Sequence, residues 1–504
     1  MRGIPSLITD IRKKVFTEVA RMAYSGEDYA KAEDLPFLIV PGDQPLHRES
    51  IFLERAIAGE RVRLAMGLSV RSVQTRSLMT EGMDHAAIAR QYYEPPLVNI
   101  IPYACHVCPA NRYWVTDVCQ NCLAASCQQV CPREAISFVN GKSRIDPAKC
   151  IRCGKCAQAC PYHAIVHLER PCQAACGMDA IGMDEHGRAT INQEKCVACG
   201  QCLVSCPFGA IVDKGQIYQV VRSIMQGDKV IVILAPAFAR QFGKDVTIAK
   251  LASALKQLGF ADVVEVAIGA DICAVEEAKD FVENVPANQP FMATSCCPAW
   301  HAMVHKLFPA QAKNISMTLT PMVYTARMVK REQPDAKIVF AGPCAAKKLE
   351  AIRETIRSDV DFVLTFEELQ GMFEAKEVSF ETLEDSTDVK DASTAAGRGF
   401  AVAGGVARAV VDIIHEQHPD MEIKVANAEG LRECRKLMNL AKAGKYNGYL
   451  LEGMACPGGC IAGAGTLLSL DQAAKSVALE QKNAARKNPL ESEFSGLAEE
   501  LNEF

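Results

Sequence analysis

The sequence predicts an α/β domain with mainly parallel sheets, preceded by a small cysteine-rich α+β domain and an N-terminal helical segment. Three observations lead to this prediction. The chain has 504 residues, which is more than one ordinary core holds. Strand-like and helix-like apolar runs alternate between residues 216 and 470. Sixteen of the 23 cysteines lie between Cys105 and Cys206, and the first hundred residues contain none.

Four parts are expected along the chain. Residues 1–100 place apolar side chains at helical spacing, as in Ile51–Ala58, and predict packing or docking helices without visible chemistry. Residues 101–215 hold the cysteines, and we expect few helices or long strands there because metal clusters would replace a hydrophobic core. Residues 216–470 form the α/β domain, and residues 471–504 form a polar helical tail.

Within the α/β region, short apolar runs predict strands and longer ones predict helices. Val230–Ala235 is a continuous apolar run of the kind found in buried strands. Helices are expected at Ile248–Leu258 and Ile272–Asn284. Further strands are expected at Val263–Ala267, Phe291–Ala293, Lys337–Ala341, Phe362–Leu364, Ile423–Ala426 and Tyr449–Glu452. Alternation of this kind predicts a largely parallel sheet.

Charge and composition exclude several classes of protein. Lys and Arg number 55 against 60 Asp and Glu, a net charge of −5 that argues against nucleic acid as the main partner. No run of eighteen apolar residues predicts a membrane span, and no signal-peptide core follows Met1–Pro5. These features predict a cytoplasmic protein with reduced thiols, and reduced thiols at short regular spacing predict metal sites.

Two copies of a strong cysteine motif define the cysteine-rich segment. Each has the spacing C-x2-C-x2-C-x3-C-P, the run found in bacterial ferredoxins, in which three cysteines hold one 4Fe-4S cluster and the fourth crosses to a second. Zinc is disfavoured because zinc ribbons use isolated CxxC pairs. The two copies comprise Cys150, Cys153, Cys156 and Cys160, and Cys196, Cys199, Cys202 and Cys206.

The other eight cysteines of this segment suggest two more clusters. They form a looser copy, a half copy and an isolated pair: Cys119, Cys122, Cys127 and Cys131; Cys172 and Cys176; Cys105 and Cys108. The crossing rule predicts the sets Cys119/Cys122/Cys127/Cys160, Cys150/Cys153/Cys156/Cys131, Cys196/Cys199/Cys202/Cys176 and Cys206/Cys172/Cys105/Cys108. In an alternative, the two strong copies pair directly and the remaining eight cysteines form their own pair; both versions give four 4Fe-4S clusters.

Three further cysteine motifs each follow an expected strand of the α/β region. They are Thr294–Trp300 (TSCCPAW), Gly342–Glu350 (GPCAAKKLE) and Glu452–Cys460 (EGMACPGGC). Because loops at the carboxyl ends of parallel strands gather at one crevice, we expect their five thiols to meet at a single site. The isolated Cys273 and Cys434 are more typical of small buried apolar side chains.

These motifs, in this order, resemble the three signatures of the iron-iron (FeFe) hydrogenases, and the resemblance covers about residues 100–465. It implies that Cys297, Cys344, Cys456 and Cys460 hold a 4Fe-4S cubane. It also implies that Cys460 bridges the cubane to a two-iron unit carrying CO, cyanide and an azadithiolate, which together make the H-cluster. Lys347 and Pro236 would contact the cyanides, and Met454 would pack over the two-iron unit.

The resemblance also implies a proton route. Cys296 would exchange the proton with the bridging amine, and the residues Thr320, Glu277 and Asp280 would connect it to solvent. The alternative is that these carboxylates form an ordinary solvated helix face. Departures from the common signatures at Ala299, Gly342 and the Ala462–Gly465 run resemble a divergent subgroup called group B.

The implied reaction is the reversible conversion of two protons and two electrons into dihydrogen. Electrons would pass through the accessory clusters to a ferredoxin-like carrier, and maturation proteins would supply the two-iron unit. Gly397–Gly399 and Gly404–Gly405 form no dinucleotide fingerprint, which favours a one-electron carrier over NAD. The alternatives are a hydrogen sensor, an iron–sulfur assembly relative without the two-iron unit, and an electron-transfer subunit.

Overall fold

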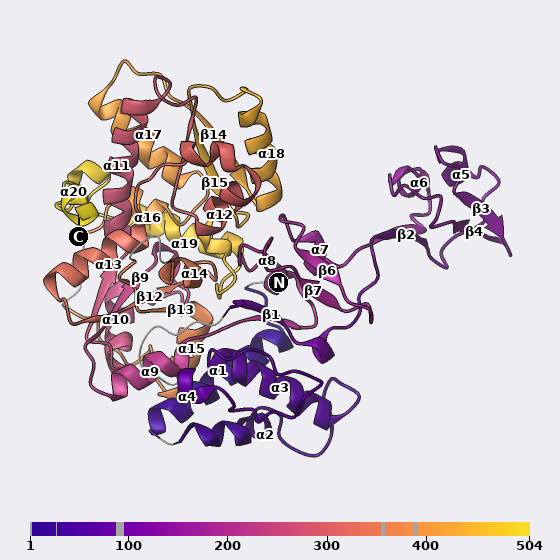
Figure 1. Ribbon diagram of the computed structural model, residues 1–504, viewed down its shortest axis with the longest axis horizontal. Helices are drawn as coiled ribbons and strands as arrows, with labels where there is room; N and C mark the ends of the chain where they lie inside the picture. The colour runs from indigo at the N-terminus through magenta and orange to yellow at the C-terminus, as the bar shows by residue number, and fades with distance from the viewer. Residues whose placement is uncertain (1–2, 27, 87–94, 354–357, 388–391, 504) are drawn as a thin grey trace.

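The computed structural model describes residues 3–26, 28–86, 95–353, 358–387 and 392–503. Two all-parallel sheets form the centre of the body (Figure 1). The four-stranded sheet has the order β10-β9-β12-β13 (Asp262–Glu265, Val230–Leu234, Lys337–Gly342, Phe362–Thr365). The three-stranded sheet has the order β11-β15-β14 (Met292–Ala293, Tyr449–Met454, Lys424–Glu429). The predicted parallel α/β fold is confirmed, but its strands divide between two sheets.

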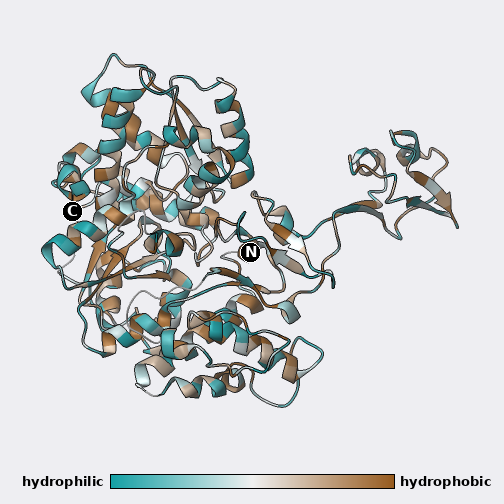
Figure 2. Cartoon of the chain, in the orientation of Figure 1, coloured by the Kyte–Doolittle hydropathy of each residue, from teal (hydrophilic) through white to brown (hydrophobic). Residues whose placement is uncertain are grey.

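The central strands form because their side chains are apolar on both faces. All five residues of β9 are buried, as expected of a strand covered by helices on either side. Figure 2 shows these hydrophobic strands inside the body. The helices around the sheets are α9 (Ile217–Met225), α10 (Ile248–Gln257), α11 (Ala267–Asn284), α12 (Pro298–Leu307), α13 (Pro321–Glu332), α14 (Lys347–Ala351), α15 (Phe366–Ala375), α16 (Ala395–Gly399), α17 (Gly405–Gln417) and α18 (Leu431–Lys442).

Two helices after the last strand belong to the body and do not extend from it as a separate tail. α19 (Leu470–Asn483) packs on α16, and α20 (Ala498–Glu503) packs on α13. Leu501 in α20 is fully buried, and Arg327 donates a 2.7 Å hydrogen bond to its carbonyl. The helical character expected for this region is present, and its apolar residues close one side of the core.

The N-terminal segment consists of α1 (Leu7–Ser25), α2 (Leu35–Ile39), α3 (Ile51–Ala65) and α4 (Met83–Ala86). A capping box starts α1. The Ser6 side chain accepts a hydrogen bond from the backbone N–H of Thr9, and the Thr9 side chain accepts one from the backbone N–H of Ser6. α1 packs against α15 and α9, so this segment continues the core of the α/β domain. The predicted boundary at residue 100 falls at the end of β1 (Val98–Ile100), which pairs with β8 and belongs to the next unit.

The cysteine-rich segment contains two βαββαβ units, one inserted inside the other. The outer unit comprises β1, α7 (Pro171–Ala174), the β6–β7 hairpin (Ile181–Met183, Ala189–Ile191), α8 (Gln201–Ser205) and β8 (Ile211–Asp213). The inserted unit, residues 112–168, comprises β2 (Arg112–Val115), α5 (Ser126–Gln129), the β3–β4 hairpin (Ile136–Val139, Lys142–Ile145), α6 (Lys155–Ala159) and β5 (Ile165–Leu168). In each unit the first and last strands pair antiparallel.

Two chain segments connect the inserted unit to the outer unit, and the inserted unit stands away from the body (Figure 1). The outer unit lies against the body (Figure 1). The short helices and strands agree with the expectation that clusters replace a hydrophobic core here. The nesting also explains why the sequence shows half motifs. The insertion separates Cys105 and Cys108 from Cys172 and Cys176, which would otherwise form one continuous run.

Candidate active site at the ends of the two sheets

Loops from both sheets supply the walls of one cavity. Cys296 and Cys297 follow β11, Cys344 follows β12, and Cys456 and Cys460 follow β15. All five thiols line this cavity, together with Pro236, Lys347 and Met454. Because β12 belongs to one sheet and β11 and β15 to the other, the site forms where the carboxyl ends of the two sheets face each other.

Four of these thiols form a group that suits a cubane. Burial and the neighbouring charge of Cys297 together raise the pKa of Cys344 to about 11. Burial and the charges of Cys344 and Cys297 likewise raise the pKa of Cys456 and of Cys460. Four crowded thiols in an apolar cavity become thiolates only with a strong positive partner, which a metal cluster provides.

The described side chains do not form a ready-made site for a single metal ion. Among the residues that the structure describes, no three Cys, His, Asp or Glu side chains converge as the ligands of one metal ion would. A cubane takes one thiolate on each of four irons and so holds its ligands further apart.

Among the residues that the structure describes, Lys347 alone brings an ammonium group to the cavity wall, where it pairs with the Glu350 carboxylate. Its Nζ lies 2.6 Å from Glu350 Oε2, 3.3 Å from Thr320 Oγ1 and 3.5 Å from the Cys296 carbonyl. Burial alone would lower the pKa of Lys347, but the charges of Glu350, Cys344 and Cys296 raise it above its ordinary value. Lys347 is therefore charged and oriented toward a site that gathers negative charge.

Glu277 of α11 lies next to Cys296 and is fully buried. Its Oε1 accepts hydrogen bonds from Ser295 N at 2.8 Å and Ser295 Oγ at 3.1 Å. Its Oε2 is buried and has no hydrogen-bond partner. Burial raises the pKa of Glu277 to about 7, although the Ser295 bonds lower it. Burial and the charge of Glu277 in turn raise the pKa of Cys296. Glu277 can therefore take up and release a proton near neutral pH.

Asp280 lies one helical turn after Glu277 on α11 and lines a second cavity. Ser316 Oγ donates to Asp280 Oδ2 at 2.8 Å and lies 2.9 Å from Thr318 Oγ1. Asp280, Ser316 and Thr318 line a wide cavity open to solvent. The solvated-face alternative therefore describes Asp280 in part, but not the buried Glu277.

The structure differs from the predicted route at Thr320. Its hydroxyl donates to Glu350 Oε1 at 2.5 Å, so Thr320 belongs with Lys347 rather than between Glu277 and Asp280. Ser316 takes the place expected of Thr320. Ser316 belongs to no motif and follows Ile315, which forms an isolated bridge with Ala293, so nothing local in the sequence indicates its contact with Asp280.

Two glycines beside the site are required by packing. A Cβ on Gly342 would lie 2.7 Å from the Phe340 ring and 2.8 Å from Ala235 Cβ. Phe340 lines the cavity, so the side chain missing at Gly342 is replaced by this ring. A Cβ on Gly453 would lie 2.3 Å from Trp300, which is buried and donates to the Thr294 carbonyl.

The loops of the cysteine-rich units repeat one backbone pattern. A left-handed residue stands two positions after the first cysteine in four loops, at Val107, Asn121, Arg152 and Ala198. Another stands three positions after the last cysteine, at Glu134, His163, Asp179 and Gly209. Backbone N–H groups donate to the sulfurs of Cys105, Cys119, Cys131, Cys150, Cys160, Cys176 and Cys196 at 3.3–3.5 Å. The pattern identifies Cys105–Cys108 as a genuine first half of a motif.

The neighbours of individual thiols favour the first of the two predicted pairings. Burial raises the pKa of Cys172 to about 11, with further contributions from Cys206, Cys108 and Cys105. Burial and the charges of Cys199, Cys196 and Cys176 raise that of Cys202. Burial and the charges of Cys150 and Cys131 raise that of Cys156. For the remaining set, Ser143 contacts both Cys119 and Cys127. The position of Cys160 in that set stays a prediction.

The outer unit touches the active-site loops directly. Gln201 donates from Nε2 to Cys456 Sγ at 3.2 Å. A Cβ on Gly200 would lie 2.6 Å from Ala464 Cβ, so the two loops approach with no room between them. Cys199 lines the active-site cavity itself. The set containing Cys199 is thus the accessory set next to the proposed cubane.

Comparison with protein families agrees with this arrangement. The family described as iron only hydrogenase large subunit, C-terminal domain, matches residues 228–464. The 4Fe-4S binding domain family matches residues 143–166 and 189–212, one match in each nested unit. Residues in these ranges thus belong to a hydrogenase-type domain and to 4Fe-4S cluster domains.

Whole-chain relatives extend the match. The chain is 32% identical over 367 residues to a periplasmic Fe hydrogenase large subunit from Nitratidesulfovibrio vulgaris, covering 64% of this chain and 85% of that one. It is 31% identical over 387 residues to iron hydrogenase 1 from Clostridium pasteurianum, covering 66% and 67%. It is 29% identical over 297 residues to a probable cytosolic Fe-S cluster assembly factor from Drosophila virilis, covering 48% and 62%.

Among solved structures, a similar chain is an apo FeFe-hydrogenase HydA1 from Chlamydomonas reinhardtii, with a TM-score of 0.46 and 23% identity, covering 55% of this chain and 89% of that chain. The sequence relatives show that the chain belongs to the iron-only, or FeFe, hydrogenase family. The predicted family and iron–sulfur character are confirmed. No helix among the described residues is long and apolar enough to cross a membrane.

Proposed function

We propose that the protein is a hydrogenase that interconverts dihydrogen with two protons and two electrons. The observation that carries the proposal is the single cavity in which five thiols meet a buried, charged lysine. Cys297, Cys344, Cys456 and Cys460 are the four ligands available for the cubane of an H-cluster. When bound, the H-cluster supplies the redox chemistry at the hydrogen–hydrogen bond.

The remaining residues of the cavity orient charge and exclude water. Lys347, held by Glu350 and Thr320, is the donor available to an anionic ligand such as cyanide. Pro236 and Met454 form apolar walls. The cavity wall around Lys347 is mostly apolar, so a hydrogen bond from its ammonium is stronger than it would be in water.

Cys296 is the proton carrier nearest the cavity, since it is not needed as a cubane ligand. Its thiol passes the proton to Glu277, whose pKa of about 7 allows either protonation state at neutral pH. Asp280 and Ser316 then connect Glu277 to the solvent-lined cavity.

The nested units would hold the accessory clusters that supply electron transfer to and from the active site. The set around Cys199 contacts the active-site loop, and Cys202 lies near Cys172 of the next set. The inserted unit would hold two further clusters, which makes four accessory 4Fe-4S clusters in all. It stands away from the body, so it is the natural outer end of this path (Figure 1).

The inserted unit also has a surface suited to binding an electron carrier. Ile151, after Cys150, is 56% exposed, whereas its counterpart Val197 in the outer unit is 5% exposed because the body covers it. Residues 112–168 contain seven Lys and Arg against three Asp and Glu, although the whole chain is acidic. An acidic, ferredoxin-like one-electron carrier fits this basic and partly apolar surface.

The decisive test is hydrogen evolution from reduced methyl viologen by the full chain, after maturation proteins or a synthetic two-iron unit have loaded the site. We expect infrared bands of CO and cyanide together with gas evolution. Lys347→Met should lose both, while Lys348→Arg, at the neighbouring position outside the cavity, should keep them. Infrared bands without gas in the wild type would refute the catalytic proposal.

A second candidate is an assembly or electron-transfer role without turnover, which the relatives named as Fe-S cluster assembly factors favour. It predicts a loaded cubane but no CO or cyanide bands under the same conditions. A hydrogen sensor would show the bands with very slow turnover. A cytoplasmic location is also a proposal. One relative is named as a periplasmic protein, so membership of the family does not by itself specify the compartment.

A further inference from the structure

Two buried arginines lie beside the four thiols Cys105, Cys108, Cys172 and Cys206. Arg61 of α3 is 8% exposed and Arg170, just before α7, is 4% exposed. Each donates one hydrogen bond to a glycine carbonyl, Arg61 to Gly209 at 3.0 Å and Arg170 to Gly187 at 2.8 Å. The Nε of each is buried and has no hydrogen-bond partner among the residues that the structure describes.

Neither guanidinium forms an ion pair with a carboxylate among the described residues. The buried Arg12, by contrast, lies 2.6 Å from Glu367 and 3.7 Å from Asp213. The charged side chains that act on Arg61 are Arg12 and Arg48, which repel it, and Cys206, which attracts it. A buried, unpaired cation is costly, so a negative group must lie close to it in the working protein.

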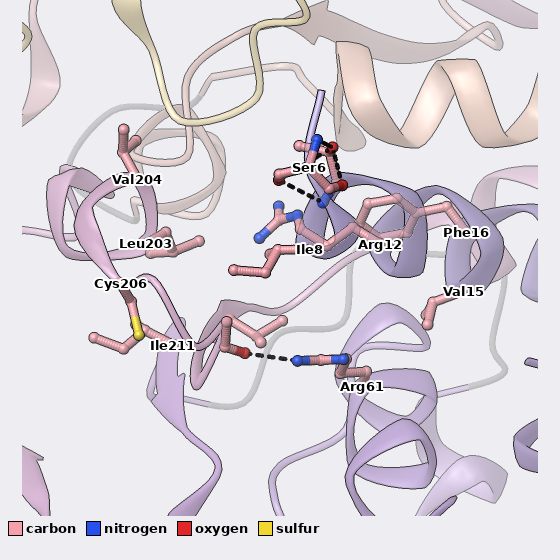
Figure 3. A pocket seen from close by; sticks show the side chains of 13 residues that line it. Ser6, Ile8, Arg12, Val15, Phe16, Arg61, Leu203, Val204, Cys206 and Ile211 are labelled. Carbon is pink, nitrogen blue, oxygen red and sulfur yellow. Dashed lines mark hydrogen bonds between the residues drawn. The ribbon is translucent and has the colours of Figure 1, made fainter. Parts of the chain in front are cut away.

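Figure 3 shows Arg61 and Cys206 on the walls of one pocket between α1, α3 and the outer unit. Burial lowers the pKa of Arg61 to about 10, and the Cys206 thiolate opposes that fall. On the other side, Arg170 stands two residues before Cys172 and bonds to the Gly187 carbonyl. A Cβ on Gly187 would lie 3.0 Å from Val107 Cγ1, so Arg170 is held near the loop between Cys105 and Cys108. Each arginine therefore lies near different cysteines of the same set.

The turn after Cys206 is adapted to Arg61. Its left-handed position is Gly209, whereas the equivalent positions in the other loops are Glu134, His163 and Asp179. A Cβ on Gly209 would lie 2.9 Å from Arg61 Nη2 and 3.1 Å from Ile8 Cγ2. Because side chains stand at this position elsewhere, the glycine is needed here for the approach of the N-terminal segment and not for the turn itself.

We propose that Arg61 and Arg170 are the charge partners of the 4Fe-4S cluster held by Cys105, Cys108, Cys172 and Cys206, and that they raise its reduction potential. The inference rests on the proposed cluster assignment. A cubane with four thiolates is anionic, and reduction adds one negative charge. Fixed cations within a poorly solvated wall stabilise the reduced form more than the oxidised one. This gives residues 1–100 a role in setting the electron path.

The test is the reduction potential of this cluster in the full chain reconstituted with iron and sulfide, followed by EPR during a redox titration. The signal of the cluster is the one that Cys172→Ala removes. Arg61→Met and Arg170→Met should each raise the ratio of oxidised to reduced cluster about tenfold at a fixed solution potential, a fall of about 59 mV for one electron.

Two further variants separate charge from packing. Arg61→Lys keeps the charge and should stay close to the wild-type potential. Arg170→Lys likewise keeps the charge on the other side of the cluster and should stay close to the wild-type potential. The matched control is Arg144→Met, which removes an exposed arginine of β4 in the inserted unit and should leave this signal unchanged.

Unchanged potentials in Arg61→Met and Arg170→Met would overturn the role of the arginines, as would an equal shift in Arg61→Lys. A wild-type chain that lacks the Cys172-dependent signal would instead overturn the cluster assignment. The measurement needs no two-iron unit and no hydrogen turnover, so it is independent of the catalytic proposal.

Discussion

Replacement of Glu277 by glutamine tests whether this buried carboxyl carries the proton. Gln has the same shape and keeps an oxygen for the two bonds from Ser295, at 2.8 and 3.1 Å. It removes the ionisable group and places an amide where Oε2 has no hydrogen-bond partner. The packing around α11 is therefore nearly unchanged, and the loss of the titrating proton is the main effect.

The pKa of Glu277 determines the size of the effect on stability. It is raised from 4.5 to about 7, and the side chain is fully buried. At about 1.4 kcal/mol per pKa unit, ionisation in the folded state costs roughly 3 kcal/mol. Because the folded protein holds this proton more tightly than the unfolded chain, its contribution is complete below pH 4.5 and is lost as pH rises to about 7.

Urea unfolding of wild type and Glu277→Gln at pH 5 and pH 8 measures this contribution. The free energy of unfolding should fall by about 3 kcal/mol more in the wild type than in the variant between these pH values. Glu283→Gln, on the exposed face of the same helix, is the control and should behave as the wild type.

Hydrogen evolution by loaded Glu277→Gln should fall about 10²–10⁴-fold, the range for loss of a general acid–base group. Infrared bands of the H-cluster should be retained, since Glu277 is not a ligand. An identical pH dependence of stability in variant and wild type, or full activity in the variant, would refute the reasoning.

Five other substitutions test separate parts of the molecule. Cys105→Ala and Cys172→Ala should each lose about four irons and the same EPR signal; different missing signals would contradict the proposed pairing. Ser316→Ala should slow proton transfer about tenfold or more by removing its bond to Asp280. Thr320→Val removes a hydrogen bond to Lys347 and should instead shift the infrared bands. Slow proton transfer in Thr320→Val but not in Ser316→Ala would restore the route predicted from the sequence. Lys348→Met leaves Asp213 and Glu368 buried without this cation, at 2.9 and 3.1 Å, and should cost about 3–5 kcal/mol in urea unfolding; an unchanged midpoint would contradict it.

Much of the active site could be predicted from sequence because its ligands lie in short motifs at strand ends. The strand before Cys344 and the strand before Cys456 are both strongly apolar, so their ends could be located within a residue or two. Parallel strands then place their following loops at one edge. The five thiols, from positions as far apart as Cys296 and Cys460, could therefore be predicted to share one site, and all five line one cavity.

Contacts that depend on side chains from unrelated segments could not be predicted. Ser316 reaches Asp280 from a segment without a motif, and Thr320 turns toward Glu350 because Lys347 stands there. The two arginines beside Cys206 and Cys108 have no local signal either. Arg61 is one of several buried charged residues on α3, and its place on the pocket wall with Cys206 becomes visible only in the folded protein.

Local chemistry was thus determined by the sequence itself: cysteine spacing specifies which residues can share a cluster, and apolar runs specify strands and their ends. The tertiary structure alone decided that two sheets face each other across the site, and that one ferredoxin-like unit is inserted in another. It also decided that the N-terminal helices deliver a cation to the outer unit. The physical reason is that ligand spacing acts over a few residues, whereas burial and charge pairing depend on segments that meet only after folding.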